Sequence, residues 1–411
     1  MKNLVYLLAL SLLYSCGGPS SPEQPPPFSD AQSLGKALFS DVNLSADRSQ
    51  SCATCHNPDR AFIDTRLGAD GNISAVSLGD DGISLGDRNT PTAAYARFSP
   101  AFTNESHARF NSQQGAYSGH VGGQFIDGRA EDLADQAAGP PLNPIEMAMP
   151  DKQAVVQRIL ENGAYTSAFK LLFGEAVFGD SDQAYAKMAE SIALFEQTDE
   201  FSSFDSKYDK SLRGEYVYSP LSKAALGKAL FFSQQFTNCA TCHQLHANGH
   251  QQEMFTSYEY HNIGVPKNSN VRAVNGKGED FIDPGLLGNE LVFNESEKGK
   301  FKVPTLRNVA VTQPYMHNGV FGNLKTVIEF YDHYLAASEH TQNPETAFAW
   351  QAPEVIENLA LLELEDGRTL DNREVEALVC FLWTLTDERY EHFLEEIEAA
   401  KAEQDRVDCD L

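Results

Sequence analysis

Basic residues are scarce in this sequence. Its 411 residues include 31 Lys and Arg against 58 Asp and Glu, so the formal net charge is −27. A surface this acidic repels phosphate backbones and anionic lipid headgroups. The composition therefore predicts no nucleic-acid partner.

Cysteine is also scarce, and no long apolar run follows the first residues. Seven cysteines are too few for a scaffold held together by disulfides. No run after the N-terminus approaches the roughly 20 apolar residues of a transmembrane helix. With 42% hydrophobic and 22% charged residues, the composition is that of a folded protein, and the length favours two domains plus extra segments.

The N-terminus has the features of an export signal. One lysine precedes an apolar run at residues 4–14, which is too short for a permanent membrane span. Residues 13–16 (LYSC) resemble a bacterial lipobox, in which cleavage before Cys16 leaves a lipid-carrying cysteine. The alternative is an ordinary secretory signal. We predict a lipoprotein-type signal at 1–16, a linker at 17–30, and a periplasmic protein anchored by lipid to the outer membrane.

An internal repeat predicts the domain organisation. The segment LGKALF at 34–39 returns at 226–231, and CATCH follows each copy, at 52–56 and 239–243. Repetition of this kind indicates two related domains. We place them at 31–200 and 215–390, with the boundary between Thr198 and Lys223 and a helical tail at 391–411.

The sequence is mostly helical in its periodicity. Each half ends with apolar residues on one helical face, namely Met188, Ile192 and Phe195 in the first and Val375, Leu378, Val379 and Leu382 in the second. Asp371, three residues before Glu374, predicts a capping box. The stretches 57–130 and 244–305 lack such periodicity, and a bound cofactor would explain how loops this long are ordered.

The two CxxCH motifs predict covalent haem c. Two thiols three positions apart can form thioethers with both vinyl groups, while the next residue presents an imidazole to iron. The motifs supply Cys52, Cys55 and His56 in the first half and Cys239, Cys242 and His243 in the second. A zinc site or a pair of redox dithiols is the alternative. The histidine after both pairs, the repeat and the export signal favour two haems with His56 and His243 as proximal ligands.

Five further motifs match one known family. They are RNTPT at 88–92, DGRA at 127–130, GPPLNPIEM at 139–147, PTLRN at 304–308 and PYMHNG at 314–319. From about residue 34 to 387, the chain resembles the bacterial di-haem cytochrome c peroxidases, a family that includes MauG. The resemblance implies a mainly α fold of two cytochrome c-like domains, each with one covalent haem c and long ordered loops. It also implies a peroxide site at the first haem and an electron relay at the second.

The resemblance assigns the proton chemistry to Glu146. This residue matches the family's acid-base carboxylate, and Gln136 matches its polar partner. Cleavage of an iron-bound peroxide requires a group that removes a proton from one oxygen and delivers it to the other. The alternative is that Glu146 only caps a turn after Pro144.

The distal ligand of the second haem stays open between two residues. The family places it seventeen residues beyond the proline of PYMHNG, as methionine in typical peroxidases and tyrosine in MauG, and here that position is Tyr331. The alternative for Tyr331 is packing on a helix face with Val327 and Ile328. Met316 is the other candidate ligand, although its motif position also suits a packing residue.

Two departures from the family pattern bear on mechanism. No histidine lies between His56 and His107, where many relatives carry a loop histidine that blocks the first haem. This favours an open site that reacts with peroxide without prior reduction, as in the MauG-like branch. The family's inter-haem tryptophan is replaced by Ile126, which leaves Phe125 and Tyr95 as candidate carriers and weighs against long-range oxidation of a protein substrate.

The leading functional prediction is reduction of hydrogen peroxide with electrons from a small periplasmic cytochrome or cupredoxin. A MauG-like enzyme that oxidises a protein or organic substrate, and a non-enzymatic electron-transfer cytochrome, are the alternatives. The resemblance also implies one calcium ion held by Asn89, Thr312 and Pro314, with a plain turn as the alternative for Pro314. A homodimer, and a disulfide between Cys380 and Cys409, are left open.

Overall fold

The computed structural model describes residues 28–110, 114–403, 406–409 and 411. The predicted signal, most of the linker and the lipid-carrying Cys16 lie outside the described residues. Among the helices of the described residues, none combines the length and apolar character needed to cross a membrane.

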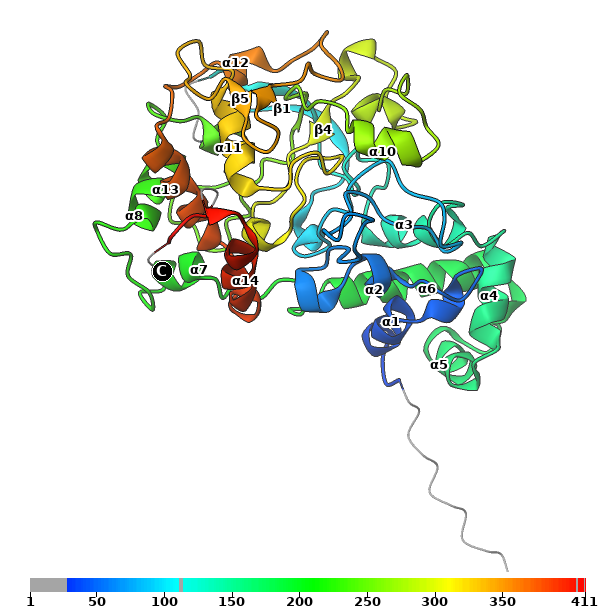
Figure 1. Ribbon diagram of the computed structural model, residues 1–411. Helices are drawn as coiled ribbons and strands as arrows, with labels where there is room; N and C mark the ends of the chain where they lie inside the picture. The colour runs from blue at the N-terminus through cyan, green and yellow to red at the C-terminus, as the bar shows by residue number, and fades with distance from the viewer. Residues whose placement is uncertain (1–27, 111–113, 404–405, 410) are drawn as a thin grey trace, which may run out of the picture.

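The N-terminal half is built from six helices that pack around one hydrophobic core (Figure 1). They are α1 (Ala31–Phe39), α2 (Cys52–Cys55), α3 (Leu133–Ala137), α4 (Lys152–Leu160), α5 (Gly163–Phe173) and α6 (Ser181–Glu196). Asp151, Asn162 and Asp180 cap α4, α5 and α6 with side-chain oxygens that accept main-chain N–H groups. The predicted apolar face of α6 is confirmed, since Met188, Ile192 and Phe195 are buried.

The C-terminal half has a second core and eight helices. They are α7 (Lys207–Leu212), α8 (Lys223–Phe231), α9 (Cys239–Cys242), α10 (Ser269–Val274), α11 (Leu324–Asp332), α12 (Leu361–Leu364), α13 (Asn372–Trp383) and α14 (His392–Ala400). The predicted capping box of Asp371 and Glu374 is present at the start of α13, and the predicted apolar face of that helix is buried. A mainly α fold is therefore confirmed.

Three short antiparallel strand pairs lie among the loops. They are β1 (Thr103–His107) with β2 (Tyr117–Val121), β3 (Tyr260–His261) with β4 (Phe301–Lys302), and β5 (Gln342–Asn343) with β6 (Phe348–Ala349). The β1–β2 hairpin, in which Thr103 pairs with Val121, falls in the stretch expected to be loop. The side chains of β1 are mostly exposed and those of β2 mostly half-buried, and neither strand alternates apolar and polar residues, so the pattern that predicts a strand is missing.

The repeated LGKALF segment has the same packing role in both halves. It forms α1, which packs on α6, and α8, which packs on α13 (Figure 1). A Cβ on Gly35 would lie 1.8 Å from the carbonyl oxygen of Ser191, and a Cβ on Gly227 would lie 1.8 Å from that of Ala377. Only glycine permits helix axes to approach this closely, so the repeat fixes one helix crossing twice.

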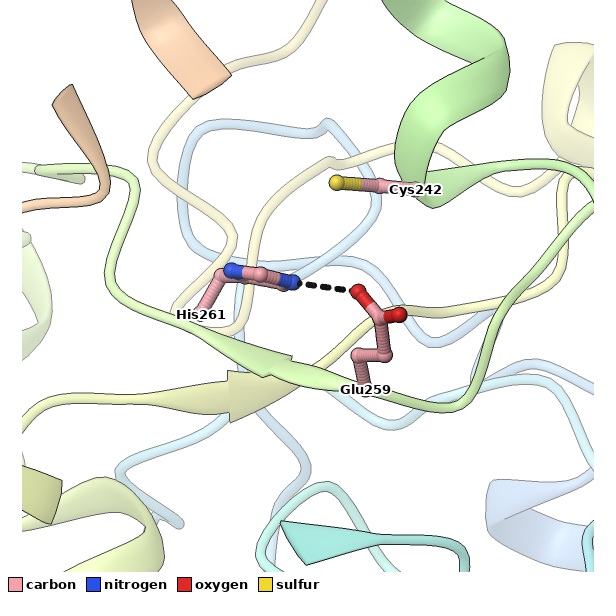
Figure 2. A group of neighbouring side chains, drawn as sticks. All are labelled: Cys242, Glu259 and His261. Atoms are coloured by element: carbon pink, nitrogen blue, oxygen red, sulfur yellow. Dashed lines mark hydrogen bonds and ion pairs between the residues drawn. The ribbon is translucent and has the colours of Figure 1, made fainter. Parts of the chain in front are cut away.

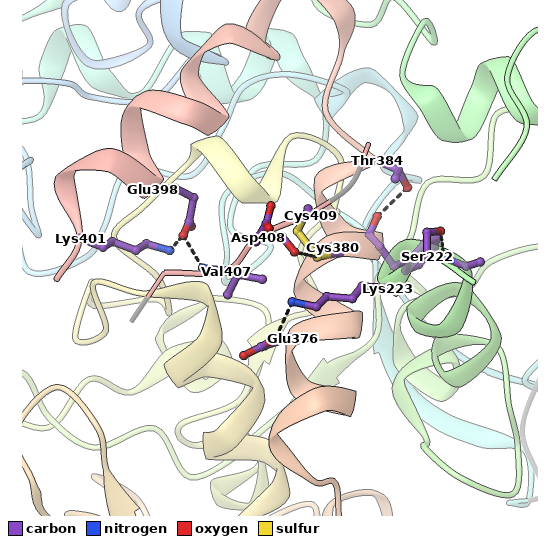
Figure 3. The surroundings of a disulfide bond; sticks show 12 residues. Ser222, Lys223, Glu376, Cys380, Thr384, Glu398, Lys401, Val407, Asp408 and Cys409 are labelled. Atoms are coloured by element: carbon purple, nitrogen blue, oxygen red, sulfur yellow. Dashed lines mark hydrogen bonds and ion pairs between the residues drawn. A yellow bond between two sulfur atoms is a disulfide. The ribbon is translucent and has the colours of Figure 1, made fainter. Parts of the chain in front are cut away.

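A disulfide joins the end of the chain to α13. Cys380 on α13 is bonded to Cys409, with their Cα atoms 5.4 Å apart (Figure 3). The sequence left open whether Cys380 and Cys409 form a disulfide, and the structure contains this bond. Among the described residues of the expected helical tail, α14 forms the α-helix. Beyond it, buried Val407 donates its main-chain N–H to Glu398 at 2.8 Å.

Candidate haem sites

The two motif histidines are oriented in the same way. The Nδ1 of His56 donates to the carbonyl oxygen of Phe62 at 3.1 Å, and the Nδ1 of His243 donates to that of Phe255 at 3.1 Å. This bond fixes the tautomer and leaves Nε2 to bind a metal. In each half, Nε2 is therefore the imidazole nitrogen that could bind a metal.

The carbonyl groups that orient these histidines are themselves held in matching ways. Phe62 and Phe255 both adopt left-handed backbone conformations, with φ of 55° and 54°. Beside them, Thr92 Oγ1 donates to the Ala61 carbonyl at 2.6 Å, and Thr305 Oγ1 donates to the Met254 carbonyl at 2.7 Å. The PT pairs of RNTPT and PTLRN thus serve as equivalent supports in the two halves.

Glu146 is half-buried near the first motif. Asn143 Nδ2 donates to Glu146 Oε1 at 2.8 Å. Burial is the largest cause that raises the thiol pKa values of Cys52 and Cys55, and the negative charge of Glu146 adds to the rise in both. Burial raises the pKa of Glu146 itself, while Arg129 and the bond from Asn143 oppose the rise. A carboxyl group can both take and give a proton, and burial favours its protonated form.

Gln136 lies on α3, one turn before the loop that carries Glu146. Its side chain is half-buried, and the Gly139 N–H donates to its main-chain carbonyl at 3.0 Å where α3 ends. No hydrogen bond of its side chain is found in the described part of the chain, so its assignment as the polar partner of Glu146 stays a prediction.

A cavity of about 420 Å³ opens at the second motif. Cys239, Cys242 and His243 line it together with apolar residues of α11 and α13. This volume falls in the usual range for cofactor pockets. Two thiols, an oriented imidazole and a mainly apolar wall fit a covalently bound haem.

Both candidate distal ligands reach this cavity. Tyr331 on α11 and Met316 line its wall, and Val327 and Ile328 on the same face of α11 do so as well. Tyr331 is 37% exposed, and part of that exposure is to the cavity it lines. Burial is the largest cause that raises the pKa of its phenol, and negative charge on Cys242 and Cys239 would raise it further. The choice between Tyr331 and Met316 stays a prediction.

Residues from the first half complete the cavity wall. Ile126, Phe125 and Tyr95 all line it, so the residue that replaces the family's tryptophan does lie between the two halves. The three residues predicted to hold calcium, Asn89, Thr312 and Pro314, also line this cavity. Asn89 and Thr312 in addition line a smaller neighbouring pocket.

A charged cluster beside the second motif was not anticipated from the sequence. Cys242, Glu259 and His261 have ligand atoms within 4.8 Å of one another (Figure 2). Fully buried Glu259 also pairs with Arg109 and His107 from the first half. Burial lowers the pKa of His261, and the hydrogen bond to Glu259 together with its charge opposes this by raising it. A thioether at Cys242 removes its charge, so we interpret the cluster as an ion-pair network rather than a metal site.

Comparisons with known proteins agree with this geometry. A family model described as di-haem cytochrome c peroxidase, CCP_MauG, matches residues 29–217. The chain is 47% identical to the methylamine utilization protein MauG of Paracoccus denitrificans, over 98% of this chain and 100% of that protein. It is 30% identical to cytochrome c551 peroxidase of Nitrosomonas europaea, over 79% of this chain and 82% of that protein. The crystal structure of the diheme peroxidase BthA from Burkholderia thailandensis superposes with a TM-score of 0.74 and 29% identity, covering 88% of this chain and 87% of that one.

Proposed function

Because the chain belongs to the di-haem cytochrome c peroxidase and MauG family, we propose that it reduces hydrogen peroxide at the first haem site with electrons that enter through the second. The observation that carries the proposal is the half-buried carboxyl of Glu146, whose charge acts on the cysteines of the first CxxCH motif. An electron-transfer cytochrome needs no proton shuttle, so this carboxyl disfavours the non-enzymatic alternative.

The protein's own residues provide the proton transfer. A haem held by Cys52, Cys55 and His56 supplies an iron atom at which peroxide can be bound and reduced. Glu146 would take a proton from one oxygen of the peroxide and deliver it to the other, which leaves as water. Asn143, which donates to Glu146 Oε1 at 2.8 Å, keeps the carboxyl in one orientation during this exchange.

Electrons come from outside the chain. We assign their entry to the haem held by Cys239, Cys242 and His243, with Tyr331 as its distal ligand. A small periplasmic cytochrome or cupredoxin is the proposed donor, in keeping with the proposed export signal and lipid anchor. The acidic net charge of −27 favours a donor with a basic contact surface.

A second candidate function follows from the similarity to MauG. The Paracoccus protein matches over its whole length at 47% identity, and Tyr331 stands at the position where the MauG pattern has tyrosine. The alternative is that electrons are taken from a protein or organic substrate rather than from a dedicated donor. Both functions share the reaction with peroxide at the first haem.

We also propose a calcium ion between the halves. The Asn89 side-chain oxygen and the Thr312 and Pro314 carbonyl groups are the neutral oxygen donors that calcium accepts. Atomic absorption should detect one calcium ion per chain, and its absence from protein purified in calcium-containing buffer would refute the site.

Mixing the ferric protein with hydrogen peroxide, without prior reduction, tests the proposal. We expect rapid spectral change and, with reduced donors present, sustained turnover. Glu146→Gln should keep both haems but lower turnover by about two to four orders of magnitude, the usual scale of general acid-base catalysis. Exposed Glu290→Gln is the matched control. Rapid reaction without turnover of any donor would favour the MauG-like function, and near-normal turnover of Glu146→Gln would remove Glu146 from the mechanism.

A further inference from the structure

Tyr95 is a buried tyrosine that contacts the loop of the first haem histidine. It is 2% exposed, and its main-chain N–H donates to the Phe201 carbonyl at 2.9 Å. The Phe201 ring stacks on Phe62 at 4.0 Å, and the Phe62 carbonyl is the group that accepts from His56 Nδ1 at 3.1 Å. Two packed residues therefore connect Tyr95 to the proximal ligand of the first haem.

The same tyrosine reaches the second haem site on its other side. Tyr95 lines the cavity that contains His243. The guanidinium of buried Arg307 lies 4.8 Å from the Tyr95 ring and 5.8 Å from the ring of Phe255, whose carbonyl accepts from His243 Nδ1 at 3.1 Å. Tyr95 is thus packed between the two loops that orient the axial histidines.

The phenol of Tyr95 is bonded to a carboxylate that water does not reach. Tyr95 Oη donates to Asp387 Oδ1 at 2.6 Å and accepts from the Phe204 N–H at 3.1 Å. Asp387 is 0% exposed, and its other oxygen accepts from Asn308 Nδ2 at 2.9 Å. Burial raises the pKa of both the phenol and the carboxyl.

A structural role alone does not account for a carboxylate here. A buried phenol needs one acceptor, and a carbonyl or an asparagine side chain provides it without the several kcal/mol that it costs to bury a charge. Arg307 is already paired in bidentate fashion with Asp209, at 2.9 and 3.0 Å. Asp387 is therefore an additional negative charge, placed where a phenol that loses an electron must lose its proton.

We propose that Tyr95 is a redox relay between the two haems and that Asp387 is its proton acceptor. Tyr95 gives one electron to the haem group that peroxide has oxidised at the first site, and its phenolic proton moves to Asp387 Oδ1. An electron from the reduced second haem then restores the phenol, and the proton returns from Asp387. Two such passages deliver the two electrons that, with two protons from solvent, convert one peroxide to two waters.

The charges in the cluster favour this pathway. Before oxidation the cluster carries one net negative charge, from Asp387, Asp209 and Arg307. Its net charge is zero after Tyr95 has lost an electron and Asp387 has taken the phenolic proton. Loss of charge is favourable in a buried site because the charged form is poorly solvated. The Phe204 N–H remains as a hydrogen-bond donor to the tyrosyl oxygen.

Freeze-quench electron paramagnetic resonance tests the relay, which rests on the proposed reaction with peroxide. The ferric holoprotein is mixed with equimolar hydrogen peroxide, once unlabelled and once after expression with ring-deuterated tyrosine. Both samples should give a radical signal, and the signal of the deuterated protein should be narrower. Tyr95→Phe should abolish that signal while retaining both haems. Tyr258→Phe is the matched control and should leave it unchanged, because Tyr258 lines the same cavity and is 6% exposed but its hydroxyl has no hydrogen-bond partner in the described residues.

Asp387→Asn provides a second variant that keeps a hydrogen-bond acceptor but cannot take the proton. It should lose the radical signal and keep the haem content. A tyrosyl signal that survives in both Tyr95→Phe and Asp387→Asn, or a wild-type protein that consumes peroxide without any tyrosyl signal, would overturn the relay and leave the proposed function intact. A ferric wild-type protein that does not react with peroxide at all would overturn the proposed function, and the relay with it.

Discussion

The choice between Tyr331 and Met316 as distal ligand determines which donors can reduce the second haem. A phenolate is a harder and more negative ligand than a thioether, so it stabilises ferric iron and lowers the reduction potential. If Tyr331 is the ligand, Tyr331→Met should raise the potential of that haem by on the order of 100 mV or more. Spectroelectrochemical titration of the variant measures the shift.

Met316→Leu is the control for this experiment, because Met316 lines the same cavity. We expect it to leave the potential unchanged. Loss of a methionine-to-iron charge-transfer band in Met316→Leu, with an intact spectrum in Tyr331→Phe, would instead assign the ligand to Met316.

Glu196 at the end of α6 should make stability depend on pH. It is 6% exposed, its Oε2 has no hydrogen-bond partner in the described residues, and burial raises its pKa from 4.5 to about 8. Below pH 4.5 the carboxyl is neutral in both folded and unfolded chains. Between pH 4.5 and about 8 only the unfolded chain ionises, so the folded state loses stability as pH rises.

Glu196→Gln removes this loss. The melting temperature of the variant should therefore exceed that of the wild-type protein at pH 8 and match it at pH 4.5. Glu190→Gln, on an exposed face of the same helix, should show no such dependence on pH. An equal shift for Glu196→Gln at both pH values would contradict the neutral, buried carboxyl.

The helix crossing repeated in both halves depends on glycine. Alanine at position 227 would gain about 1 kcal/mol in helix propensity, but its Cβ would lie 1.8 Å from the Ala377 carbonyl oxygen and force α8 away from α13. Overpacking of this kind costs about 1–3 kcal/mol or more, so Gly227→Ala should lower the free energy of unfolding. Denaturant titration measures the effect.

Gly163→Ala provides the control. A Cβ at Gly163, the first residue of α5, has no heavy atom within 4 Å. This variant should be neutral or slightly stabilising, and comparable destabilisation in both variants would remove the close helix crossing as the cause.

Local features were predictable from the sequence, and long-range ones were not. The helices α6 and α13 and the cap at Asp371 follow from apolar periodicity and side-chain spacing within a few residues. The hairpin of β1 and β2 was not predicted because its residues, exposed in β1 and mostly half-buried in β2, show no alternation of apolar and polar side chains.

The candidate site shows the same division. A CxxCH motif names its own ligands, since the chemistry is contained in five consecutive residues. The bond from Tyr95 to Asp387 joins residues 292 positions apart, and it exists only because the two halves dock. Glu259 and Arg109 are separated by 150 positions for the same reason, so no local pattern could reveal their pairing.

At the scale of the whole molecule, each half should bind its haem independently. The two hydrophobic cores are formed largely by separate parts of the chain. Replacing Cys52 and Cys55 with alanine should therefore remove one covalent haem and leave the other, and replacing Cys239 and Cys242 should do the converse. Mass spectrometry of the denatured chain measures this count. Loss of both haems from either variant would show that the halves mature together.

The disulfide between Cys380 and Cys409 sets an order on maturation. Thioether formation requires the four motif cysteines as reduced thiols, whereas the remaining bridge requires oxidation. Cys409 follows both haem motifs in the sequence, so if the chain is exported N-terminus first, as proposed, both motifs emerge before Cys409. Haem attachment, which needs reduced thiols, can thus precede formation of the Cys380–Cys409 disulfide, which needs oxidation. The position of Cys409 in the sequence allows the two reactions to occur one after the other.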